Sequence, residues 1–255
     1  MKTKLFYFSG TGNSYWVAKE LGTRIGESEL LSIPQSGDER FDLENTGVGI
    51  VCPLYFLSFP KIVMEFIQKQ DFESADYVFI VVTMGWTLKG GIFGHARELM
   101  GKGKPDLGMY IQMPMNDIIY VNLHSVQGQQ KILQQAGQRL DRIAAKIIKR
   151  EKKIDWEPLS IIRKSRHQPF IKSLTTNQDR FRVTAECTQC RICAKVCPVH
   201  NIEFVSEMPV WGNRCEECEA CLHYCPARAV EFGPNTATKG RYVNPNLTLD
   251  ERLKI

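Results

Sequence analysis

Eight of the nine cysteines lie in two short runs toward the C-terminal end of the 255-residue chain. Both runs, over residues 187–198 and 215–226, read Cys-x2-Cys-x2-Cys-x3-Cys-Pro. Two-residue gaps let a tightly turning loop aim three thiolates at three corners of a four-iron cluster, and the fourth thiolate comes from elsewhere. Structural zinc prefers two Cys-x2-Cys pairs per ion, and disulfide frameworks belong mostly to small secreted chains. The spacing therefore predicts iron–sulfur ligation rather than zinc binding or cross-linking.

The two cysteine runs belong to a longer internal duplication. A shift of 28 residues maps the first run onto the second, and it also maps Glu203 and Phe204 onto Glu231 and Phe232. A repeat that preserves ligand and core positions implies two copies of one small unit about a pseudo-twofold axis. Because the eight cysteines fill every ligand position, His223 inside the second run is expected to be an exposed side chain.

The first 150 residues alternate strand-like runs with stretches of helical periodicity, which is typical of a parallel sheet covered by helices. The β-branched and aromatic content of these runs suits strands that are buried on both faces. Apolar runs predict five strands, at residues 4–8, 30–33, 48–52, 77–83 and 109–113. We therefore expect an α/β fold with a five-stranded parallel sheet.

A Ser-Gly-Thr-Gly-Asn-Ser loop at residues 9–14 follows the first expected strand and opens the first expected helix. Hydroxyls, an amide and free backbone N–H groups at a helix N-terminus make an anion site, because orphan donors and the helix dipole both favour phosphate. A dinucleotide-binding loop would carry a third glycine where this chain has Tyr15, and no acidic residue closes the second strand to hold a ribose. A terminal monophosphate therefore fits better than a bridging pyrophosphate.

On this loop and its surrounding strands, residues 1–150 resemble flavodoxin, an FMN-binding, doubly wound parallel sheet of five strands in the order 2-1-3-4-5. The phosphate contacts that the resemblance implies are Ser9, Thr11, Asn13 and Ser14, with the backbone of Gly10 and Gly12. It also implies that the flavin ring lies between the loops after the third and fourth strands. The candidate ring contacts there are Pro53, Leu54, Tyr55, Phe56, Met84, Gly85, Trp86, Gly90 and Gly91. Tyr55 and Trp86 are the expected stacking partners.

The cysteine runs resemble those of bacterial two-cluster ferredoxins, in which the fourth cysteine of each run ligates the other cluster. The resemblance implies a small α+β ferredoxin-like domain over residues 182–233 that holds two [4Fe–4S] clusters. One cluster would be ligated by Cys187, Cys190, Cys193 and Cys225, and the other by Cys215, Cys218, Cys221 and Cys197. The cross-ligation would join the two halves of the domain.

A polar, basic connector over residues 151–181 separates these two units, and an irregular tail over residues 234–255 ends the chain. Residues 163–167 of the connector raise the alternative of a nucleic-acid-binding protein with structural or sensing clusters. Sparse aromatic residues and the lack of a groove-reading motif argue against it, so no nucleic-acid partner is expected. The basic stretch would instead dock an acidic ferredoxin or the chain's own cluster domain.

A flavodoxin-like domain joined to a two-cluster ferredoxin domain resembles a family of flavin and iron–sulfur fusion proteins. FMN exchanges electrons in pairs or singly, whereas each cluster passes one at a time, so such a chain can convert between the two modes. We expect an electron-transfer protein of the oxidoreductase class that relays electrons between two clusters and FMN. Its partners would be ferredoxin-type donors or acceptors. An FMN-dependent reductase of a small organic acceptor is the alternative.

No apolar stretch reaches the length of a membrane span. The longest, residues 48–59, is interrupted by Pro53 and falls short of the ~20 residues required. The N-terminal residues also lack the apolar core of a signal peptide. Together with eight cysteines in a pattern for ligation, these features predict a cytoplasmic protein.

Overall fold

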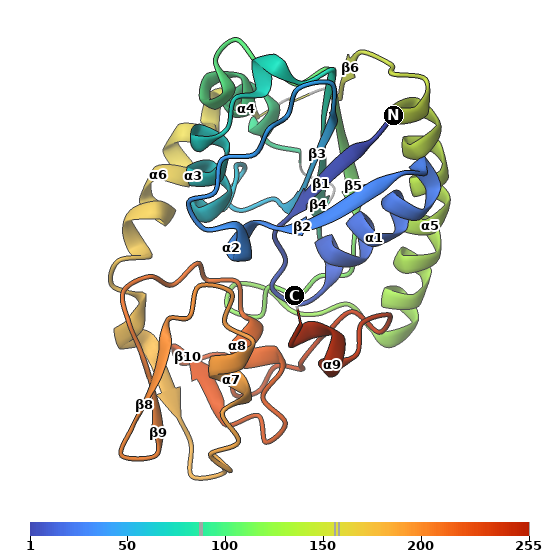
Figure 1. Cartoon of the computed structure of the whole chain (residues 1–255). Coiled ribbons are helices and arrows are strands. Elements are labelled where there is room, and N and C mark those ends of the chain that lie inside the picture. Colours follow the sequence, from blue (N-terminus) through green and yellow to red (C-terminus); the bar gives the residue numbers. More distant parts are fainter. Residues whose placement is uncertain (87–88, 156, 158, 255) are drawn as a thin grey trace.

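The computed structural model describes residues 1–86, 89–155, 157 and 159–254, and the statements below concern these residues. Helices lie on both faces of one large parallel sheet, and a smaller unit of short strands and helices lies at one end of that sheet (Figure 1). The large sheet has the strand order β2-β1-β3-β4-β5-β6. These strands are β1 (Thr3–Tyr7), β2 (Ser28–Ser32), β3 (Gly47–Pro53), β4 (Tyr77–Met84), β5 (Leu107–Gln112) and β6 (Lys153–Ile154).

The parallel α/β architecture is therefore confirmed, but the expected number of five strands is wrong. The sixth strand, β6, has two residues and pairs in parallel with Leu107 and Gly108 of β5. The backbone N–H of Lys153 donates to the Asp106 carbonyl, and that of Asp155 donates to the Gly108 carbonyl. A two-residue strand carries no periodicity that a sequence pattern can register. The strand β6 is defined only by its pairing with β5.

Five helices accompany the sheet, namely α1 (Asn13–Ile25), α2 (Ile33–Ser36), α3 (Lys61–Lys69), α4 (Ile92–Met100) and α5 (Val126–Ile148). The helices α1 and α5 pack together on one face, and α3 and α4 pack together on the other (Figure 1). Each sheet strand must therefore present apolar side chains in both directions.

The alternation along β4 shows this double burial. Val78, Ile80 and Val82 pack into the core that includes α3 and α4. The intervening Phe79 and Val81 pack into the core that includes α1 and α5. Successive side chains of a strand point to opposite faces, so burial on both sides produces the continuous apolar run seen in the sequence.

The smaller unit consists of two antiparallel strand pairs, each beside a short helix (Figure 1). Its strands are β7 (Phe181–Val183), β8 (Ile202–Val205), β9 (Met208–Trp211) and β10 (Val230–Phe232), and its helices are α7 (Ile192–Lys195) and α8 (Ala220–His223). The strand β7 pairs with β10, and β8 pairs with β9.

The register of these pairs follows the sequence duplication. Val183 lies opposite Val230, and the residues at the equivalent positions in the repeat, Trp211 and Ile202, also lie opposite each other. The helices α7 and α8 are offset by the same 28 residues. The repeat in the sequence is therefore a repeat in the structure as well.

The basic connector folds against the large sheet rather than forming a free, charged linker. Its helix α6 (Arg163–Ser173) lies beside α3 (Figure 1). The guanidinium of the buried Arg163 donates to both carboxylate oxygens of Glu98, at 3.0 and 2.8 Å. The imidazole Nε2 of the buried His167 donates to the Phe59 carbonyl at 2.8 Å. The expectation of a basic docking surface is thus wrong for these two residues, because both side chains are buried and Arg163 is paired with a carboxylate of the same chain.

The C-terminal tail returns to the large sheet and ends in the helix α9 (Leu249–Arg252). The backbone N–H of Asn244 donates to the Thr11 carbonyl at 2.9 Å. Lys19 of α1 forms an ion pair with Glu251 at 3.0 Å. The tail is therefore held against the start of α1.

Three 3-10 helices lie between these elements, η1 (Phe72–Ser74), η2 (Ser160–Ile162) and η3 (Asn177–Arg180). Within the described ranges, no helix combines the length and the apolar character that a membrane crossing requires.

We predict that acidification weakens the packing of α6 through His95. This half-buried imidazole lies 2.5 Å from the Ser58 hydroxyl, and its ring centroid lies 5.9 Å from that of His167. Burial, reinforced by the nearby charge of Arg163, lowers the pKa of His95 to about 4. An unfolded histidine has a pKa of about 6.5, so the unfolded chain binds the proton first, and stability is lost as the pH falls from 6.5 toward 4.

Urea denaturation at pH 7.5 and pH 5.5 measures this loss. With a discount for the partial exposure of the ring, His95 should account for about 1 kcal/mol of the decrease in unfolding free energy. Between the two pH values, the unfolding free energy of a His95→Gln variant should therefore decrease by about 1 kcal/mol less than that of the wild type. Equal losses in both proteins would contradict the assignment.

Candidate functional site

A cavity of about 590 Å³ opens at the carboxyl ends of the sheet strands, and we call it the sheet-end cavity. It is bordered by the loops that follow β1, β3, β4 and β5. In open α/β sheets, ligands bind outside the carboxyl ends of the strands, where the strand order reverses. The reversal here falls between β1 and β3. The volume lies within the roughly 300–1,000 Å³ of small-molecule sites.

Most of the predicted phosphate and ring contacts line the sheet-end cavity. They are Ser9, Gly10, Thr11, Asn13, Ser14, Pro53, Leu54, Tyr55, Phe56, Met84, Gly85 and Trp86. Gly12, Gly90 and Gly91 lie outside its lining. Gly12 precedes α1 with a φ of 97°, and Gly91 precedes α4. Gly90 packs against the backbone of Leu57.

The loop over residues 9–14 turns tightly into α1. Its turn is fixed by the Gly12 N–H, which donates to Ser9 Oγ at 3.1 Å. The hydroxyls of Ser14 and Thr83 lie 2.8 Å apart and join the loop to the end of β4. Gly12 supplies no side chain to cap α1. The first-turn N–H groups of a helix lack intrahelical acceptors and attract anions, so this end of the cavity is suited to a phosphate.

Aromatic side chains form the walls of the cavity away from that loop. Phe56 stacks on Phe170 with ring centroids 4.5 Å apart and 19° between the planes. Tyr120 meets Phe56 edge-on at 5.3 Å, and Tyr55 meets Phe170 edge-on at 6.0 Å. Trp86 lines the cavity with 56% of its surface exposed. Such flat apolar walls suit a planar ring system.

Sequence reasoning missed the part of this wall that comes from the connector. Leu159, Ile162, Arg166 and Phe170 all line the sheet-end cavity. The helix α6 carries Arg166 and Phe170, contains Pro169 and lacks a regular apolar stripe. The one sequence signal was Phe170, an aromatic residue within an otherwise polar stretch.

The eight clustered cysteines form two groups in the structure, as their mutual electrostatic effects show. We call Cys187, Cys190, Cys193 and Cys225 the outer set, and Cys197, Cys215, Cys218 and Cys221 the inner set. Burial raises the pKa of Cys193 to about 11, and the other three thiols of the outer set raise it further. Burial likewise raises the pKa of Cys221, with added contributions from its three companions of the inner set.

Backbone geometry repeats around the two sets. Residues at equivalent positions share a left-handed φ: 57° and 50° at Gln189 and Glu217, and 60° and 59° at Arg191 and Glu219. Such values are uncommon for residues with a side chain, and they recur where a loop must turn sharply. Both cysteine loops therefore wind in the same way.

Backbone N–H groups point at the sulfur atoms. Cys197 Sγ accepts the N–H of Asn201 at 3.3 Å, and the equivalent Cys225 Sγ accepts that of Ala229 at 3.2 Å. Cys215 Sγ also accepts the N–H of Glu217 at 3.3 Å. Hydrogen bonds to sulfur favour the thiolate form that ligates iron, and they tune its potential.

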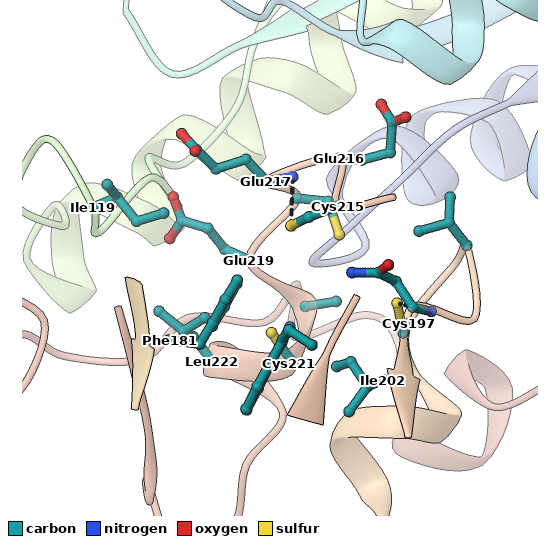
Figure 2. A pocket seen from close by; sticks show the side chains of 15 residues that line it. Ile119, Phe181, Cys197, Ile202, Cys215, Glu216, Glu217, Glu219, Cys221 and Leu222 are labelled. Atoms are coloured by element: carbon teal, nitrogen blue, oxygen red, sulfur yellow. Dashed lines mark hydrogen bonds between the residues drawn. The ribbon is translucent and has the colours of Figure 1, made fainter. Parts of the chain in front are cut away.

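No three His, Cys, Asp or Glu side chains of the described residues converge closely enough to hold a single metal ion. A four-iron cluster makes a different demand, because each iron takes one protein thiolate. The inner set lines an apolar cavity together with Ile119, Phe181, Ile202, Trp211 and Leu222 (Figure 2). Four thiols from two chain segments around a largely apolar cavity suit a thiolate-bound cluster.

Three buried glutamates, which sequence reasoning missed, surround the inner set (Figure 2). Their carboxylates bind groups on or near the large sheet. Glu216 accepts the N–H of Ile62 at 3.1 Å, and Glu219 accepts that of Ile118 at 2.9 Å. The carboxylate of Glu217 accepts the Tyr120 hydroxyl at 2.7 Å and also an N–H of Asn177. These bonds hold the inner cysteine loop against the sheet.

Burial dominates the acid–base properties of these carboxyls. It raises the pKa of Glu216 to about 7 and that of Glu219 to about 8, and it also raises the pKa of Glu217. The hydrogen bond from Ile62 works in the opposite direction on Glu216, and that from Ile118 does so on Glu219. The cysteine loop is therefore held by groups that water reaches poorly.

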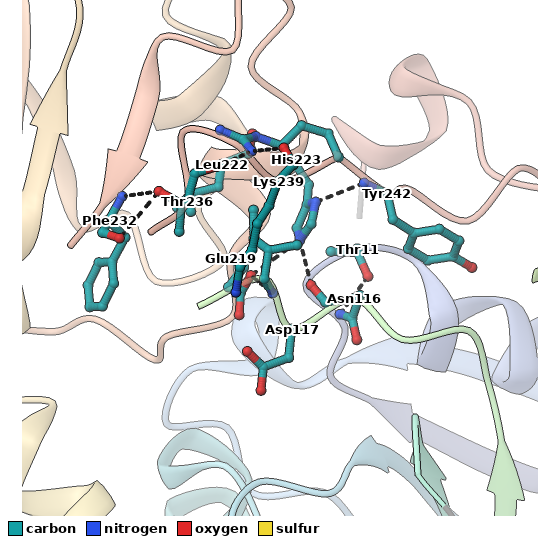
Figure 3. A network of polar contacts seen from close by, with 12 residues as sticks. Thr11, Asn116, Asp117, Glu219, Leu222, His223, Phe232, Thr236, Lys239 and Tyr242 are labelled. Atoms are coloured by element: carbon teal, nitrogen blue, oxygen red, sulfur yellow. Dashed lines mark hydrogen bonds and ion pairs between the residues drawn. The ribbon is translucent and has the colours of Figure 1, made fainter. Parts of the chain in front are cut away.

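The expectation that His223 is exposed is wrong. This residue is 6% exposed and lies at the centre of a polar network between the two units (Figure 3). Its Nε2 lies 2.6 Å from the Asn116 carbonyl, and its Nδ1 accepts the N–H of Tyr242 at 2.9 Å. Asn116 in turn donates from its side chain to the Thr11 hydroxyl at 2.9 Å. The histidine thus links the cysteine unit to the 9–14 loop.

The two candidate sites meet at one backbone contact. A Cβ placed on Gly10 would lie 2.2 Å from the Cys218 carbonyl oxygen, so the two chain segments touch where only glycine fits. Glu217, Cys218 and Glu219 also line the sheet-end cavity. One of the inner cysteines therefore borders the same cavity as the predicted phosphate loop.

Neither a family model nor a curated protein matches the chain. Solved structures resemble part of it. A flavodoxin from the domain Archaea is 15% identical over 57% of this chain and 99% of its own length, with a TM-score of 0.33. The Trp repressor binding protein from Bacillus subtilis is 15% identical over 55% of this chain and 96% of its own length, with a TM-score of 0.36. An oxidoreductase from Corynebacterium diphtheriae is 12% identical over 58% of this chain and 96% of its own length, with a TM-score of 0.38. These scores are low, so the description of the fold rests on the strand order of the chain itself.

Proposed function

We propose that this chain is an electron-transfer protein that binds FMN in the sheet-end cavity and two [4Fe–4S] clusters on the outer and inner sets. Residues 1–150 would form the flavin-binding part and residues 182–233 the cluster-binding part. The connector over residues 151–181 and the tail over residues 234–255 would hold the two parts together. Thiols that must stay reduced for ligation are in keeping with a cytoplasmic location.

One observation carries the proposal: Cys218, a candidate cluster ligand, lines the same cavity as the residues that would bind the flavin. A relay requires its redox groups to lie close together. The contact between Gly10 and Cys218 brings the phosphate loop and the inner cysteine loop together without an intervening layer.

The residues present fit both groups. Residues 9–14 provide an anion site for the terminal phosphate of FMN, and the aromatic walls around Tyr55 and Phe56 suit its ring. When bound, the flavin exchanges one or two electrons and the clusters exchange single electrons, so the chain can interconvert the two modes. The protein supplies the fixed spacing, the dry surroundings of the inner set and the backbone N–H groups that point at sulfur.

We predict that replacing one of the eight clustered cysteines lowers the iron content, whereas replacing the ninth cysteine, Cys52, does not. The anaerobically purified wild type should contain one FMN and about eight irons per chain, as two four-iron clusters require. A Cys218→Ala variant should fall to between about four and seven irons, because a cluster with three protein ligands is either lost or reduced to three irons.

The matched control for this experiment is Cys52→Ala. Cys52 is fully buried in the sheet core, and burial raises the pKa of its thiol, so it offers no thiolate. Its replacement should leave the iron and flavin contents unchanged. Iron-free wild type, or the same iron content in Cys218→Ala as in the wild type, would refute cluster binding. Wild type with iron but without flavin would refute the relay.

We further predict that Gly10→Ala weakens FMN binding. The added methyl group would overlap the Cys218 carbonyl, so the loop and the cysteine segment must move apart. Overpacking of this kind costs about 1–3 kcal/mol, which corresponds to roughly 5- to 150-fold weaker binding. Titration of flavin-free protein with FMN, followed by quenching of flavin fluorescence, measures the dissociation constant.

Gly137→Ala provides the control for steric effects of a methyl group. Nothing lies within 4 Å of a Cβ at Gly137, which is part of the helix α5. This variant should bind FMN as the wild type does. Unchanged affinity in Gly10→Ala would show that the loop does not bind the flavin phosphate in the arrangement described.

The composition of the cavity wall favours one second candidate, an FMN-dependent reductase of a small organic acceptor. The connector residues Leu159, Ile162 and Arg166 extend the lining beyond the loops that would hold the flavin. An apolar wall with one cationic group suits an organic acceptor that carries a negative charge. Rapid anaerobic turnover with quinones or nitroaromatics would favour the reductase, whereas a relay should react rapidly only with protein partners.

A further inference from the structure

The two candidate cluster sites differ in their surroundings, and this difference indicates a separate role for each site. We propose that the outer set is the port at which an acidic one-electron carrier protein docks, whereas the inner set serves only the internal path to the sheet-end cavity. This inference rests on the proposed function and adds the place of docking and the charge of the partner.

Solvent exposure separates the two sets. Cys190 of the outer set is exposed, whereas no cysteine of the inner set is exposed. The residues between the ligands follow the same division: Thr188, Gln189 and Arg191 are exposed. Their counterparts in the repeat, Glu216, Glu217 and Glu219, are buried at 5%, 8% and 6% exposure. Electron exchange with another protein requires short distances, so the exposed set is the one that a partner can approach.

The two loops also differ in charge at these repeat positions, and the sign reverses at one of them, where Arg191 is equivalent to Glu219. Where the inner loop has three glutamates, the outer loop has threonine, glutamine and arginine. The inner carboxylates are occupied by hydrogen bonds from α3, as with Glu216 and Ile62, and from the segment after β5, as with Glu219 and Ile118. Among the described residues, the outer loop makes no comparable hydrogen bonds to the flavodoxin-like part of the chain. Its charged residue Arg191 faces solvent.

A basic groove lies beside the outer set. Arg191, Lys195 and His200 line it together with Phe204, and the Arg191 guanidinium lies 4.9 Å from the Phe204 ring centroid. Arg228 is exposed three residues after Cys225. The acidic residues nearby are Glu186 before Cys187, the exposed Glu203 between the lining residues Ile202 and Phe204, and Glu207, which pairs with Arg191 at 3.4 Å.

That ion pair is solvent-exposed on both sides, with 54% and 63% of the two side chains accessible. Exposed pairs of this kind contribute little energy, so a carboxylate on a partner can replace Glu207 at low cost. A groove of arginine and lysine that borders an electron-transfer site suits a partner with an acidic face. Complementary charge mainly accelerates encounter and orients the two proteins.

The step at the port is a single-electron transfer. A cluster held by the outer set would accept the one electron that the reduced carrier loses, and no bond to hydrogen or carbon would form or break. The reverse exchange uses the same contact. Each transfer therefore balances with one carrier molecule and needs no other reactant.

The test compares two charge-reversal double variants of the intact, iron-loaded protein. Arg191→Glu with Lys195→Glu alters the port. Its backbone is compatible with glutamate, because Glu219 adopts a φ of 59° at the position equivalent to the 60° of Arg191. Lys164→Glu with Lys172→Glu makes the same charge change on exposed positions of α6, the other basic segment.

The probe is an acidic plant-type [2Fe–2S] ferredoxin, used under anaerobic conditions. Reduced probe is mixed with oxidised protein, and oxidised probe with reduced protein, so that electron transfer is favourable in one of the two experiments. Stopped-flow absorbance gives the second-order rate constant between about 50 and 500 mM salt, a range over which exposed charges become screened. The port variant should react at least about tenfold more slowly than the wild type and should lose most of the salt dependence. The α6 variant should stay within about twofold of the wild type.

Two further measurements separate failure of the port from failure of the proposed function. Iron content and reduction by dithionite, a small reductant that needs no docking, should be the same in all three proteins. If the iron is present and the port variant reacts as fast as the wild type, or if the α6 variant is the slower one, the port is overturned and the relay stands. If the wild type holds no iron, both proposals are overturned.

Discussion

The close approach of Gly10 to Cys218 is the constraint on which the arrangement of the two units depends. A side chain at position 10 would strike the Cys218 carbonyl, so the phosphate loop and the inner cysteine loop share one surface with no space between them. Other bridges also cross from one unit to the other: the carboxylates of Glu216 and Glu219, the imidazole of His223 and the C-terminal tail. The distance between the proposed redox groups is therefore set by backbone packing rather than by a flexible linker.

The groups that secure this contact are costly to bury alone. Taking a carboxylate out of water is unfavourable unless it is hydrogen-bonded. Glu216, Glu217 and Glu219 satisfy this demand with donors that the large sheet and its loops supply. The inner loop is consequently matched to this one surface. Separated from the sheet, it would leave three carboxylates without the donors that now hold them.

The sequence sufficed for the parts of the fold that local pattern controls. The apolar runs of β1, β3, β4 and β5 and the helical spacing of α1 and α5 show clear periods, and the cysteine spacing marked the residues that the structure groups into two sets. The loop over residues 9–14 was recognisable because glycines and hydroxyls crowd a helix start. It indeed lies at the sheet-end cavity.

What the sequence did not disclose depends on contacts with other segments of the chain, at separations of 19 to 107 residues. His223 is buried because Asn116 and Tyr242 meet it, and Glu219 is buried because the Ile118 N–H faces it. Nothing within the second cysteine run marks either residue as internal. Burial of Arg163 likewise needs Glu98, which lies in another helix. The β6 strand is too short to have a pattern at all. In hindsight, the change from Thr188 and Gln189 to a pair of glutamates in the repeat was the available signal.

The path of the tail has a consequence for how the molecule is assembled. Tyr242 and Asn244 both donate to the side-chain oxygen of Asn13, and Leu247 packs over Gly12. The loop over residues 9–14 and the start of α1 are thus fixed in part by tail residues that are distant in the sequence. This helix start therefore reaches its final arrangement only when segments separated by 229 and 231 residues in the sequence have come together.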